Sequence, residues 1–301
     1  MKRTVVIESE RDEATRKSMA SSATIPVMSR ETALRADEVD EFFELGWILR
    51  RALFSASEVA RMRACFDELE RIASGLTETA LHRGSYFVLG RRSDRQVIQR
   101  VVWAGGCQSY LLDIGSDARL TAPCAQLLDD GAMDHLLCQA HFKRPHDGVV
   151  FGWHQDIQHR DKGNGTWTDV NGRGSFVQTL IVLDEMTPDS GPLKFMPGSS
   201  KWGRIDFEGN DRPALRERDA VTILAQPGDT LFFGPYTAHA SFENTSDQYR
   251  RVLINGYASP GANRREYPGD GAGRRLVAPP RLSASAARCG AGASGLRRRR
   301  G

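Results

Sequence analysis

The stretch Phe151-Gly152-Trp153-His154-Gln155-Asp156 is predicted to form an extended strand that carries one histidine and one acid. Side chains two residues apart on a strand point to the same side, so the imidazole of His154 and the carboxylate of Asp156 should face one way. Such a pair could provide half of a metal site. The spacing alone is a weak signal, because a lone pair of this kind is more often a surface or hydrogen-bonded couple.

The region around this stretch has the period of two that is typical of antiparallel sheets. From His135 onward, short apolar runs alternate with turns such as Pro197-Gly198-Ser199 and Pro227-Gly228-Asp229. The strands that we expect are residues 137–143, 151–156, 176–184, 193–196, 230–233 and 250–257. This pattern predicts a mainly β fold, either a sandwich or a barrel.

Two amphipathic helices are expected before the β-rich region. The first carries apolar residues at helical spacing and ends at Gly46, and residues 47–49 then read as a strand. Ser55 and Glu58 have the spacing of a capping box that begins the second helix. Its expected buried stripe consists of Val59, Met62, Phe66, Leu69 and Ile72. Weaker patterns indicate strands at residues 86–89 and 97–103 and a helix at 118–128.

Composition divides the chain into three parts. Residues 1–30 are polar and without period, so we expect a mobile N-terminal arm. Residues 31–260 have the apolar patterns of a folded domain. Residues 261–301 consist largely of Arg, Gly, Ala, Pro and Ser, a composition that buries too little apolar surface to fold, and we expect a disordered tail there.

Charge and cysteine usage favour an ordinary cytoplasmic protein. The net charge is +3, but residues 263–301 contribute +8 (ten arginines against Glu266 and Asp270), which leaves −5 for the remainder and disfavours a nucleic-acid partner. Five scattered cysteines with no C-x-x-C pair indicate reduced thiols. No signal peptide or membrane span is expected, and monomer and dimer are equally compatible with the sequence.

The second half of the metal site could come from His239, which follows an apolar run. Two imidazoles and one carboxylate on one face of an iron leave the other positions open for a bidentate cosubstrate and O2, as expected of non-haem Fe(II) oxygenases. Arg250, at the start of an apolar strand, could hold the far carboxylate of 2-oxoglutarate, and Ser241 could donate to the same carboxylate. The alternative for Arg250 is one half of an exposed pair with Arg251, which should point the other way.

In order and spacing, these features resemble the phytanoyl-CoA dioxygenase family of Fe(II)/2-oxoglutarate-dependent oxygenases. The resemblance extends over roughly residues 31–260. The motifs that carry it are Phe42-Phe43-Glu44-Leu45-Gly46-Trp47, Phe142-Lys143-Arg144-Pro145, Trp153-His154-Gln155-Asp156, Leu183-Asp184-Glu185, Ser190-Gly191-Pro192-Leu193, Met196-Pro197-Gly198-Ser199-Ser200, Gly228-Asp229, His239 and Arg250.

The resemblance implies a double-stranded β-helix, a cupin-like jelly roll with flanking α-helices. It implies that His154, Asp156 and His239 are the catalytic iron ligands and that Arg250 binds 2-oxoglutarate, with Fe(II), 2-oxoglutarate and O2 as cofactor and cosubstrates. The expected reaction is hydroxylation of an unactivated C–H bond of a small organic molecule, such as an amino-acid derivative or a specialised metabolite, with 2-oxoglutarate decarboxylated to succinate. Related halogenases carry a small residue in place of Asp156, so hydroxylation is favoured over chlorination.

Several residues around this site have expectations of their own. Relatives often carry a tryptophan where this chain has Leu180, so the cosubstrate pocket could be lined differently. Gln139 matches a position that often faces the cosubstrate, and strand alternation places His141 on the same side, with ordinary barrel filling as the alternative. We expect Trp153, Trp167 and the polar loop at 157–174 to shape the substrate pocket, and this loop shows no basic cluster that would demand CoA or phosphate. The histidines His146 and His159 are expected to be solvated.

Other functions stay open at this stage. The same site chemistry also serves desaturation, epoxidation and cyclisation. A jelly-roll protein that only binds a ligand, with a structural metal or none, is a further possibility, although it would not need an open triad with a carboxylate clamp. A nucleic-acid-associated oxygenase that uses its arginine-rich tail is a minor one, because the rest of the chain is acidic.

Overall fold

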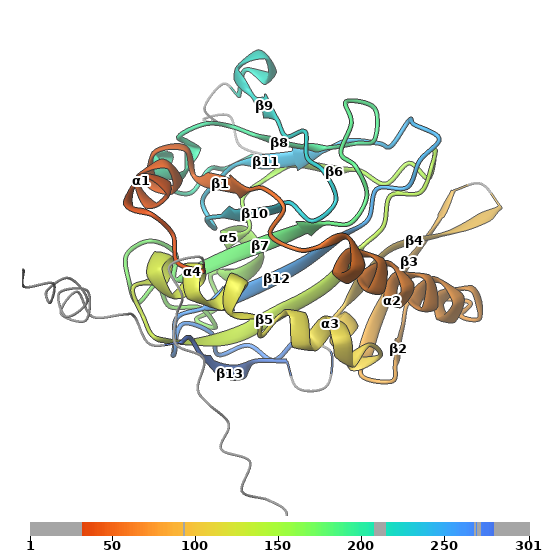
Figure 1. The fold of residues 1–301 in the computed structure, drawn as a ribbon, viewed down its shortest axis with the longest axis horizontal. Coiled ribbons are helices and arrows are strands. Elements are labelled where there is room, and N and C mark those ends of the chain that lie inside the picture. The colour runs from red at the N-terminus through yellow and green to blue at the C-terminus, as the bar shows by residue number, and fades with distance from the viewer. Residues whose placement is uncertain (1–31, 93, 208–214, 268, 270–271, 280–301) are drawn as a thin grey trace, which may run out of the picture.

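Two antiparallel sheets lie on either side of a cavity, and helices cover the outer side of the larger sheet (Figure 1). The computed structural model describes residues 32–92, 94–207, 215–267, 269 and 272–279. This arrangement is the predicted mainly β jelly roll with flanking helices. No helix within the described ranges is long and apolar enough to cross a membrane.

The large sheet carries one wall of the cavity. Its strands, in spatial order, are β1 (Trp47–Arg50), β10 (Thr230–Phe233), β7 (Phe176–Val182), β12 (Val252–Ala258), β5 (Ala132–His141), β4 (Arg95–Val102), β3 (Ser85–Arg92) and β2 (Ala80–His82), and β13 (Arg274–Val277) also pairs with β5. The small sheet is the opposite wall and has the order β6 (Phe151–His154), β11 (His239–Ser241), β8 (Leu193–Phe195) and β9 (Val221–Thr222).

The helices form as the sequence predicts. Helix α1 (Ala36–Leu45) ends at Gly46, whose φ of 99° requires the left-handed conformation that glycine adopts readily. Helix α2 (Ala56–Ser74) begins with the predicted capping box, in which the Ser55 hydroxyl accepts from the Glu58 amide and the Glu58 carboxylate accepts from the Ser55 amide. The other helical segments are η1 (Ala104–Gly106), α3 (Ser109–Ile114), α4 (Ala118–Leu128), α5 (Ile157–Arg160), η2 (Ser199–Trp202) and η3 (Glu217–Asp219).

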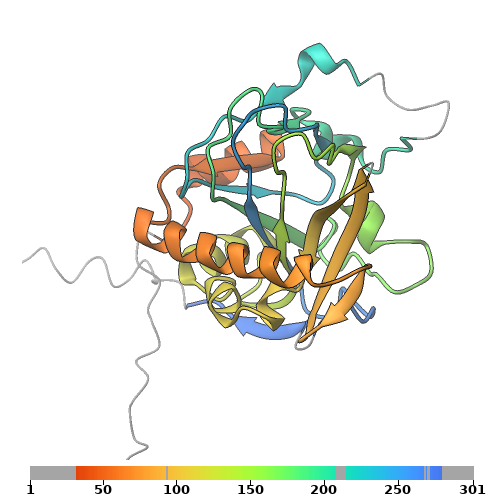
Figure 2. The same cartoon turned by 90° about the vertical axis from the view of Figure 1, so that its right-hand side faces the viewer.

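The main core lies between the helices and the outer face of the large sheet. Figures 1 and 2 show α2, α3 and α4 along this face. The whole predicted stripe of α2 is buried there, and its Phe66 packs on Phe142 with ring centroids 5.0 Å apart. Because the apolar contacts are made on the outer face, the inner face of the sheet remains available for polar side chains.

Five of the six strands expected in the β-rich region need small corrections. The strand expected at 137–143 is Ala132–His141, and the strand expected at 193–196 ends at Phe195. The strand expected at 250–257 begins at Val252, although the backbones of Arg250 and Lys143 still exchange hydrogen bonds of 3.0 and 3.2 Å. The strand expected at 176–184 ends at Val182. The stretch expected to be extended through Asp156 ends at His154, because one helical turn, α5, starts directly after Asp156.

Strand β13 corrects the expected start of the disordered tail. Arg274–Val277 pairs antiparallel with β5 over the part of its edge that β4 leaves open. The Arg274 guanidinium donates to Nδ1 of His135 at 3.2 Å, and Ala278 is buried. A short strand on an exposed sheet edge satisfies backbone groups that would otherwise be unpaired, so four residues suffice despite the arginine-rich composition.

A chain that ends at Pro260 is therefore expected to be less stable than one that ends at Pro279. Loss of β13 removes the partly buried Leu276 side chain, the buried Ala278 side chain and the hydrogen bonds of Arg274, which together are worth roughly 2–4 kcal/mol. Urea unfolding of the two truncated chains measures the difference. Equal free energies of unfolding would contradict the structural role of β13.

Candidate metal centre and cosubstrate pocket

A cavity of about 430 Å³ opens between the two sheets. Its walls come from strands of both sheets and from the segment that follows β6. Seven of the residues singled out from the sequence line it, namely Gln139, His141, His154, Asp156, His239, Ser241 and Arg250. The fold thus brings together side chains from β5, β6, β11 and the start of β12.

Two imidazoles and one carboxylate converge inside this cavity. His239 on β11 pairs directly with His154 on β6, and their ring centroids lie 4.2 Å apart. Nε2 of His154 is 3.8 Å from Oδ1 of Asp156, and Nε2 of His239 is 3.5 Å from Oδ2. Ligands at right angles around an ion with bonds of about 2.1 Å lie about 3 Å apart, so a slight closing of these side chains would place all three on one ion.

Hydrogen bonds fix the tautomers of both imidazoles. Nδ1 of His154 is 2.7 Å from the carbonyl oxygen of Gly152, and Nδ1 of His239 is 2.9 Å from that of Thr237. A carbonyl oxygen only accepts, so both Nδ1 atoms carry the hydrogen and both Nε2 lone pairs face the cavity. This is the tautomer that a metal needs.

The charges of the donors also suit a divalent cation. Burial, together with the neighbouring His154, lowers the pKa of His239 to about 4, so this ring is neutral at pH 7. Burial opposes ionisation of Asp156, but His239 and His154 still lower its pKa below the usual range. The Gln178 side-chain amide donates to Oδ2 of Asp156 and orients the carboxylate. Two neutral nitrogens and one carboxylate fit Fe(II).

The residue between the two donors, Gln155, is locked in place. Its amide donates to the carbonyl oxygens of Gly203 at 2.8 Å and Tyr236 at 2.6 Å, and its oxygen accepts from the Ile205 amide at 2.8 Å. The side chain is fully buried. These bonds hold the backbone between His154 and Asp156, so both donors face the cavity although the strand ends between them.

A third histidine, His159, is exposed, as expected, and it also lies beside the triad. It follows Asp156 by three residues on α5, and its ring centroid is 5.6 Å from that of His154. Donor atoms of His154, Asp156 and His159 all lie within 4.8 Å of one another. Residues three apart share a helix face. The Asp-x-x-His spacing after a predicted strand end would therefore have been the sequence signal that His159 lies near Asp156.

Arg250 is a buried cation that lacks an acidic partner among the described residues. Its side chain is 2% exposed; one guanidinium nitrogen donates to the Gly191 carbonyl at 2.6 Å, and Nε is buried without any partner in this part of the chain. Burial lowers its pKa to about 10, so the group stays charged at pH 7. A buried charge of this kind requires a counterion, and a carboxylate bound in the cavity would supply one.

Its neighbour Arg251 points the other way, as expected from strand alternation. Its Nε donates to Asp184 at 2.8 Å, and Nη1 donates to Asp67 at 2.6 Å, both outside the cavity. The two consecutive arginines therefore differ in partner, because one faces the cavity and the other faces the helix side of the large sheet.

The sequence of the chain matches the family model described as phytanoyl-CoA dioxygenase (PhyH) over residues 42–252. The chain belongs to the phytanoyl-CoA dioxygenase family. The resemblance seen in the sequence is thereby confirmed.

Curated relatives of this family member include several hydroxylases and dioxygenases. It is 30% identical over 149 residues to the L-proline trans-4-hydroxylase of Streptomyces griseoviridis, covering 40% of this chain and 52% of that protein. It is 36% identical over 95 residues to the methylphosphonate hydroxylase of Gimesia maris, covering 30% of this chain and 36% of that protein. It is 29% identical over 170 residues to the ectoine dioxygenase of Stutzerimonas stutzeri, covering 56% of this chain and 51% of that protein. The matched part thus spans about half, or less, of these relatives.

Solved structures share the fold. EctD from S. alaskensis superposes with a TM-score of 0.62 at 24% identity, covering 81% of this chain and 84% of that one. The non-heme alpha ketoglutarate dependent epimerase SnoN from nogalamycin biosynthesis superposes with a TM-score of 0.59 at 18% identity, covering 82% of this chain and 95% of that one. These similarities confirm the jelly-roll architecture of this PhyH family member.

The side chains of Gln139 and His141 point into the cavity from alternate positions of β5. Nε2 of His141 is 2.9 Å from the side-chain oxygen of Gln139, and burial lowers the pKa of His141 well below its usual value. In this PhyH family member a neutral imidazole and an amide therefore line the floor beside the metal donors. That they contact a cosubstrate or substrate stays a prediction.

Neither tryptophan expected at the substrate pocket lies in the wall of this cavity. Trp153 precedes His154 on β6 and points to the opposite side, where it packs on Met196, Ile205 and Ala238. Trp167 is 8% exposed and meets Phe176 edge-on at 6.1 Å. The structure contradicts this expectation, because alternation along β6 turns one ring away and the hydrophobic interior holds the other.

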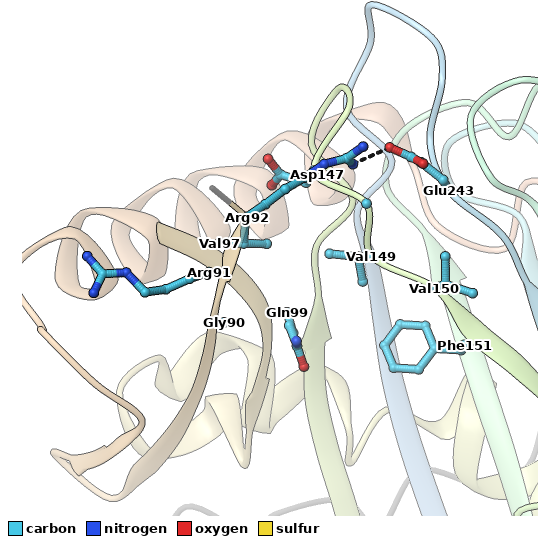
Figure 3. Close-up of a pocket in the computed structure, with 11 residues that line it drawn as sticks. Gly90, Arg91, Arg92, Val97, Gln99, Asp147, Val149, Val150, Phe151 and Glu243 are labelled. Atoms are coloured by element: carbon cyan, nitrogen blue, oxygen red, sulfur yellow. Dashed lines mark hydrogen bonds and ion pairs between the residues drawn. The ribbon is translucent and has the colours of Figure 1, made fainter. Parts of the chain in front are cut away.

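A second cavity of about 390 Å³ adjoins the first and shares Phe151 with it (Figure 3). Two of its charged residues, Arg92 and Asp147, have ion-pair partners. Arg92 pairs with Glu243 across the rim, and Asp147 binds Arg95 and, at 3.0 Å, Arg144. No cluster of metal-ligating side chains lies among its described lining residues.

Lys143 supports the strand that carries His239. The side chain is 1% exposed, and Nζ donates to the carbonyl oxygens of Ser241, at 3.0 Å, and Phe242. Burial lowers the pKa of Lys143 to about 6, so the amine is neutral at pH 7. A neutral amine has two N–H groups, which match the two carbonyls. The lysine thereby ties the end of β5 to the end of β11.

Because of this buried amine, protein stability is expected to rise with pH between about 6 and about 10. In that window the unfolded chain, with a lysine pKa of about 10.4, binds a proton that the folded chain does not, which adds up to about 1.4 kcal/mol per pH unit. Below pH 6 both states are protonated and the gain is absent. Urea unfolding from pH 6 to 9 should show this slope in the parent protein and lack it in Lys143→Met. Parallel profiles would contradict the assignment.

Proposed function

We propose that this protein is an Fe(II)/2-oxoglutarate-dependent dioxygenase that hydroxylates an unactivated C–H bond of a small organic molecule, such as an amino-acid derivative or a specialised metabolite. One observation carries the proposal. Three metal-type donors, His154, Asp156 and His239, meet in a cavity that also contains Arg250, a buried guanidinium without an acidic partner.

In this proposal, His154, Asp156 and His239 hold the iron on one face, with their Nε2 and carboxylate oxygen atoms. When bound, the iron supplies the activation of O2 that is coupled to conversion of 2-oxoglutarate to succinate. The carbonyls of Gly152 and Thr237 keep both imidazoles in the ligating tautomer. Because these contacts preorganise the donors, the protein supplies a fixed and open coordination face.

Other residues of the cavity position the reactants and exclude water. Arg250 would bind the far carboxylate of 2-oxoglutarate through charge-assisted hydrogen bonds, and the Ser241 hydroxyl lies in the same wall. Apolar side chains complete that wall, among them Leu180, Phe233 and Val252. A wall of this kind limits access of water to the reacting centre and keeps the C–H bond in place.

The names of the relatives agree with hydroxylation, since the proline and methylphosphonate enzymes are both called hydroxylases. Asp156 also favours it, because it occupies the coordination position that a chlorinating enzyme would leave free. The product distinguishes desaturation, epoxidation and cyclisation from hydroxylation. Desaturation and cyclisation remove two hydrogen atoms and add no oxygen, whereas hydroxylation and epoxidation both add one oxygen atom and are told apart by NMR of the product.

We also place this enzyme in the cytoplasm, with a small molecule and no nucleic acid as its partner. The four cysteines within the described residues, Cys65, Cys107, Cys124 and Cys138, form no disulfide with one another. Reduced, scattered thiols are typical of a reducing compartment.

The test is anaerobic addition of Fe(II) and 2-oxoglutarate to the full chain. A weak visible charge-transfer band is expected when 2-oxoglutarate chelates the bound iron. Absence of the band would remove the proposal and favour a jelly-roll protein that only binds a ligand. Once the band is observed, candidate substrates are screened by succinate release. The mass of the product after reaction in 18O2, together with its NMR spectrum, then identifies the reaction.

A further inference from the structure

The cavity of the proposed metal centre contains four cations besides Arg250. Arg100 comes from β4, Arg160 from α5, Lys162 from the loop after α5, and Arg265 from the segment that follows β12. Among the described lining residues, Asp156 carries the only carboxylate. The expectation concerned only the loop at 157–174, which contributes two of these cations, and the cluster forms when this loop meets β4 and the segment after β12.

Arg160 is the most buried of these cations and has unsatisfied donors. Its side chain packs over the rings of Phe176 and Tyr267, with the guanidinium carbon 5.3 and 4.9 Å from their centroids. The residue is 7% exposed, and both Nε and Nη1 are buried without a hydrogen-bond partner among the described residues. Donors left unpaired in the interior are costly, so a guanidinium held this way is suited to a ligand that supplies acceptors.

Arg100 faces the same cavity from the sheet. Its cross-strand neighbours are Val88 on β3 and His141 on β5, which also line the cavity. The side chain is half-buried, and within the described part of the chain it forms neither an ion pair nor a side-chain hydrogen bond. Burial alone lowers its pKa, with no acid near enough to oppose this effect.

Lys162 and Arg265 extend the cluster to the rim. Lys162 is exposed and Arg265 is half-buried, and the guanidinium carbon of Arg265 lies 5.2 Å from the centroid of Tyr267, the ring that also carries Arg160. Two guanidinium groups on one ring repel each other unless an anion lies between or beside them.

Charge balance shows that the metal centre does not neutralise this cluster. With His154 and His239 neutral, the two positive charges of Fe(II) and the single charge of Arg250 are cancelled by Asp156 and the dianion of 2-oxoglutarate. Within the described residues, Arg100, Arg160, Lys162 and Arg265 then form no ion pair with an acid. In the adjoining cavity, by contrast, Arg92 pairs with Glu243 (Figure 3).

We propose that Arg100 and Arg160, with Lys162 and Arg265 at the rim, bind an anionic group of the substrate, either a carboxylate or a phosphoryl group. This inference rests on the proposed oxygenase function and names the substrate class of that site. The anion would anchor the substrate away from the metal, so that a C–H bond elsewhere in the molecule faces it. The rim cations would attract the anion from solution, and the buried Arg160 with the half-buried Arg100 would hold it.

The experiment compares matched charged and neutral probes under anaerobic conditions, with Fe(II) and excess 2-oxoglutarate present so that Arg250 is occupied. Benzoate against benzamide tests the carboxylate, and phenylphosphonate against its dimethyl ester tests the phosphoryl group. Binding is measured by equilibrium dialysis with the full chain, its Arg160→Gln, Arg160→Lys and Arg100→Gln variants, and the control Arg92→Gln. The same dialysis is repeated without iron and 2-oxoglutarate.

We expect at least one acid to bind the parent protein at least about tenfold more tightly than its neutral partner, since a charge-assisted hydrogen bond is worth more than about 1.4 kcal/mol. Arg160→Gln and Arg100→Gln should remove this preference, whereas Arg160→Lys should retain part of it and Arg92→Gln all of it. Whichever acid is preferred assigns the class. Equal binding of acids and neutral partners, no binding of either, or an unchanged preference in both Gln variants would overturn the inference.

The visible charge-transfer band separates this result from the oxygenase proposal. A band in every variant without acid preference refutes the anion site alone. No band in the parent refutes the oxygenase function, and the dialysis without iron then still decides whether the cations bind an anion.

Thermal unfolding of the ligand-free protein separates ligand binding from a structural role. If Arg160 serves a ligand, Arg160→Gln should not lower the Tm, because it removes a buried charge without a partner. A clear fall in Tm together with unchanged probe binding would show that the arginine is structural.

Discussion

The His239→Ala variant is expected to lose both iron binding and turnover. Removal of this imidazole takes one of three metal-type donors from the cavity. Only Nε2 of His154 and the Asp156 carboxylate then remain as protein ligands. Loss of a group that only orients a metal ligand costs about 10–100-fold in affinity, so loss of the ligand itself should cost more than about 100-fold. Anaerobic Fe(II) titration, read by the charge-transfer band with 2-oxoglutarate, measures the effect.

Two matched variants sharpen this test. His146→Ala removes an exposed imidazole outside the cavity and should bind iron like the parent. His159→Ala removes the imidazole that lies beside His154 and Asp156 and should also retain iron, because the proposed third ligand is His239. If His159→Ala loses the band while His239→Ala keeps it, the ligand assignment is wrong and His159 is the third donor.

Replacement of Arg250 by glutamine should weaken 2-oxoglutarate binding without removing the metal. Truncating one partner of a buried charge pair costs about 2–5 kcal/mol, which corresponds to an increase in Kd of about 30-fold or more. The KM for 2-oxoglutarate should rise accordingly, while direct Fe(II) binding, measured without 2-oxoglutarate, should change little. Arg250→Lys should restore only part of the affinity, since an ammonium cannot make the two parallel bonds of a guanidinium.

The neighbouring arginine provides the control. Arg251→Gln removes a cation of the same strand end that pairs with Asp184 and Asp67 outside the cavity. It should lower the free energy of unfolding and leave the KM for 2-oxoglutarate near that of the parent. A larger KM effect in Arg251→Gln than in Arg250→Gln would contradict the proposed clamp.

The sequence predicted the fold because its signals are local and repeated. Period-two apolar runs, the capping box at Ser55 and the helix end at Gly46 all act within a few residues, and each recurs in the structure. The family motifs brought His154, Asp156, His239 and Arg250 into consideration for the same reason, since each lies in a short segment with a recognisable pattern.

Some errors came from local structure that the pattern did not contain. The strand through Asp156 ends two residues early, and the helical turn that follows places the exposed His159 beside the site. Trp153 has the same strand as His154 but the opposite face, so its aromatic character was no guide to its position. The composition of the C-terminal segment did not indicate β13, because four ordered residues change the overall composition of an arginine-rich segment very little.

By itself, the sequence determined the jelly-roll class, the family and the short segments that carry the donors, because these depend on neighbours along the chain. Only the tertiary structure decided which side chains share a cavity and which of them lack a counterion. Arg100, Arg160 and Arg265 are unremarkable in sequence, and they become a cluster only when β4, α5 and the segment after β12 meet. Electrostatic interaction depends on distance through space, and distant segments acquire that distance only on folding.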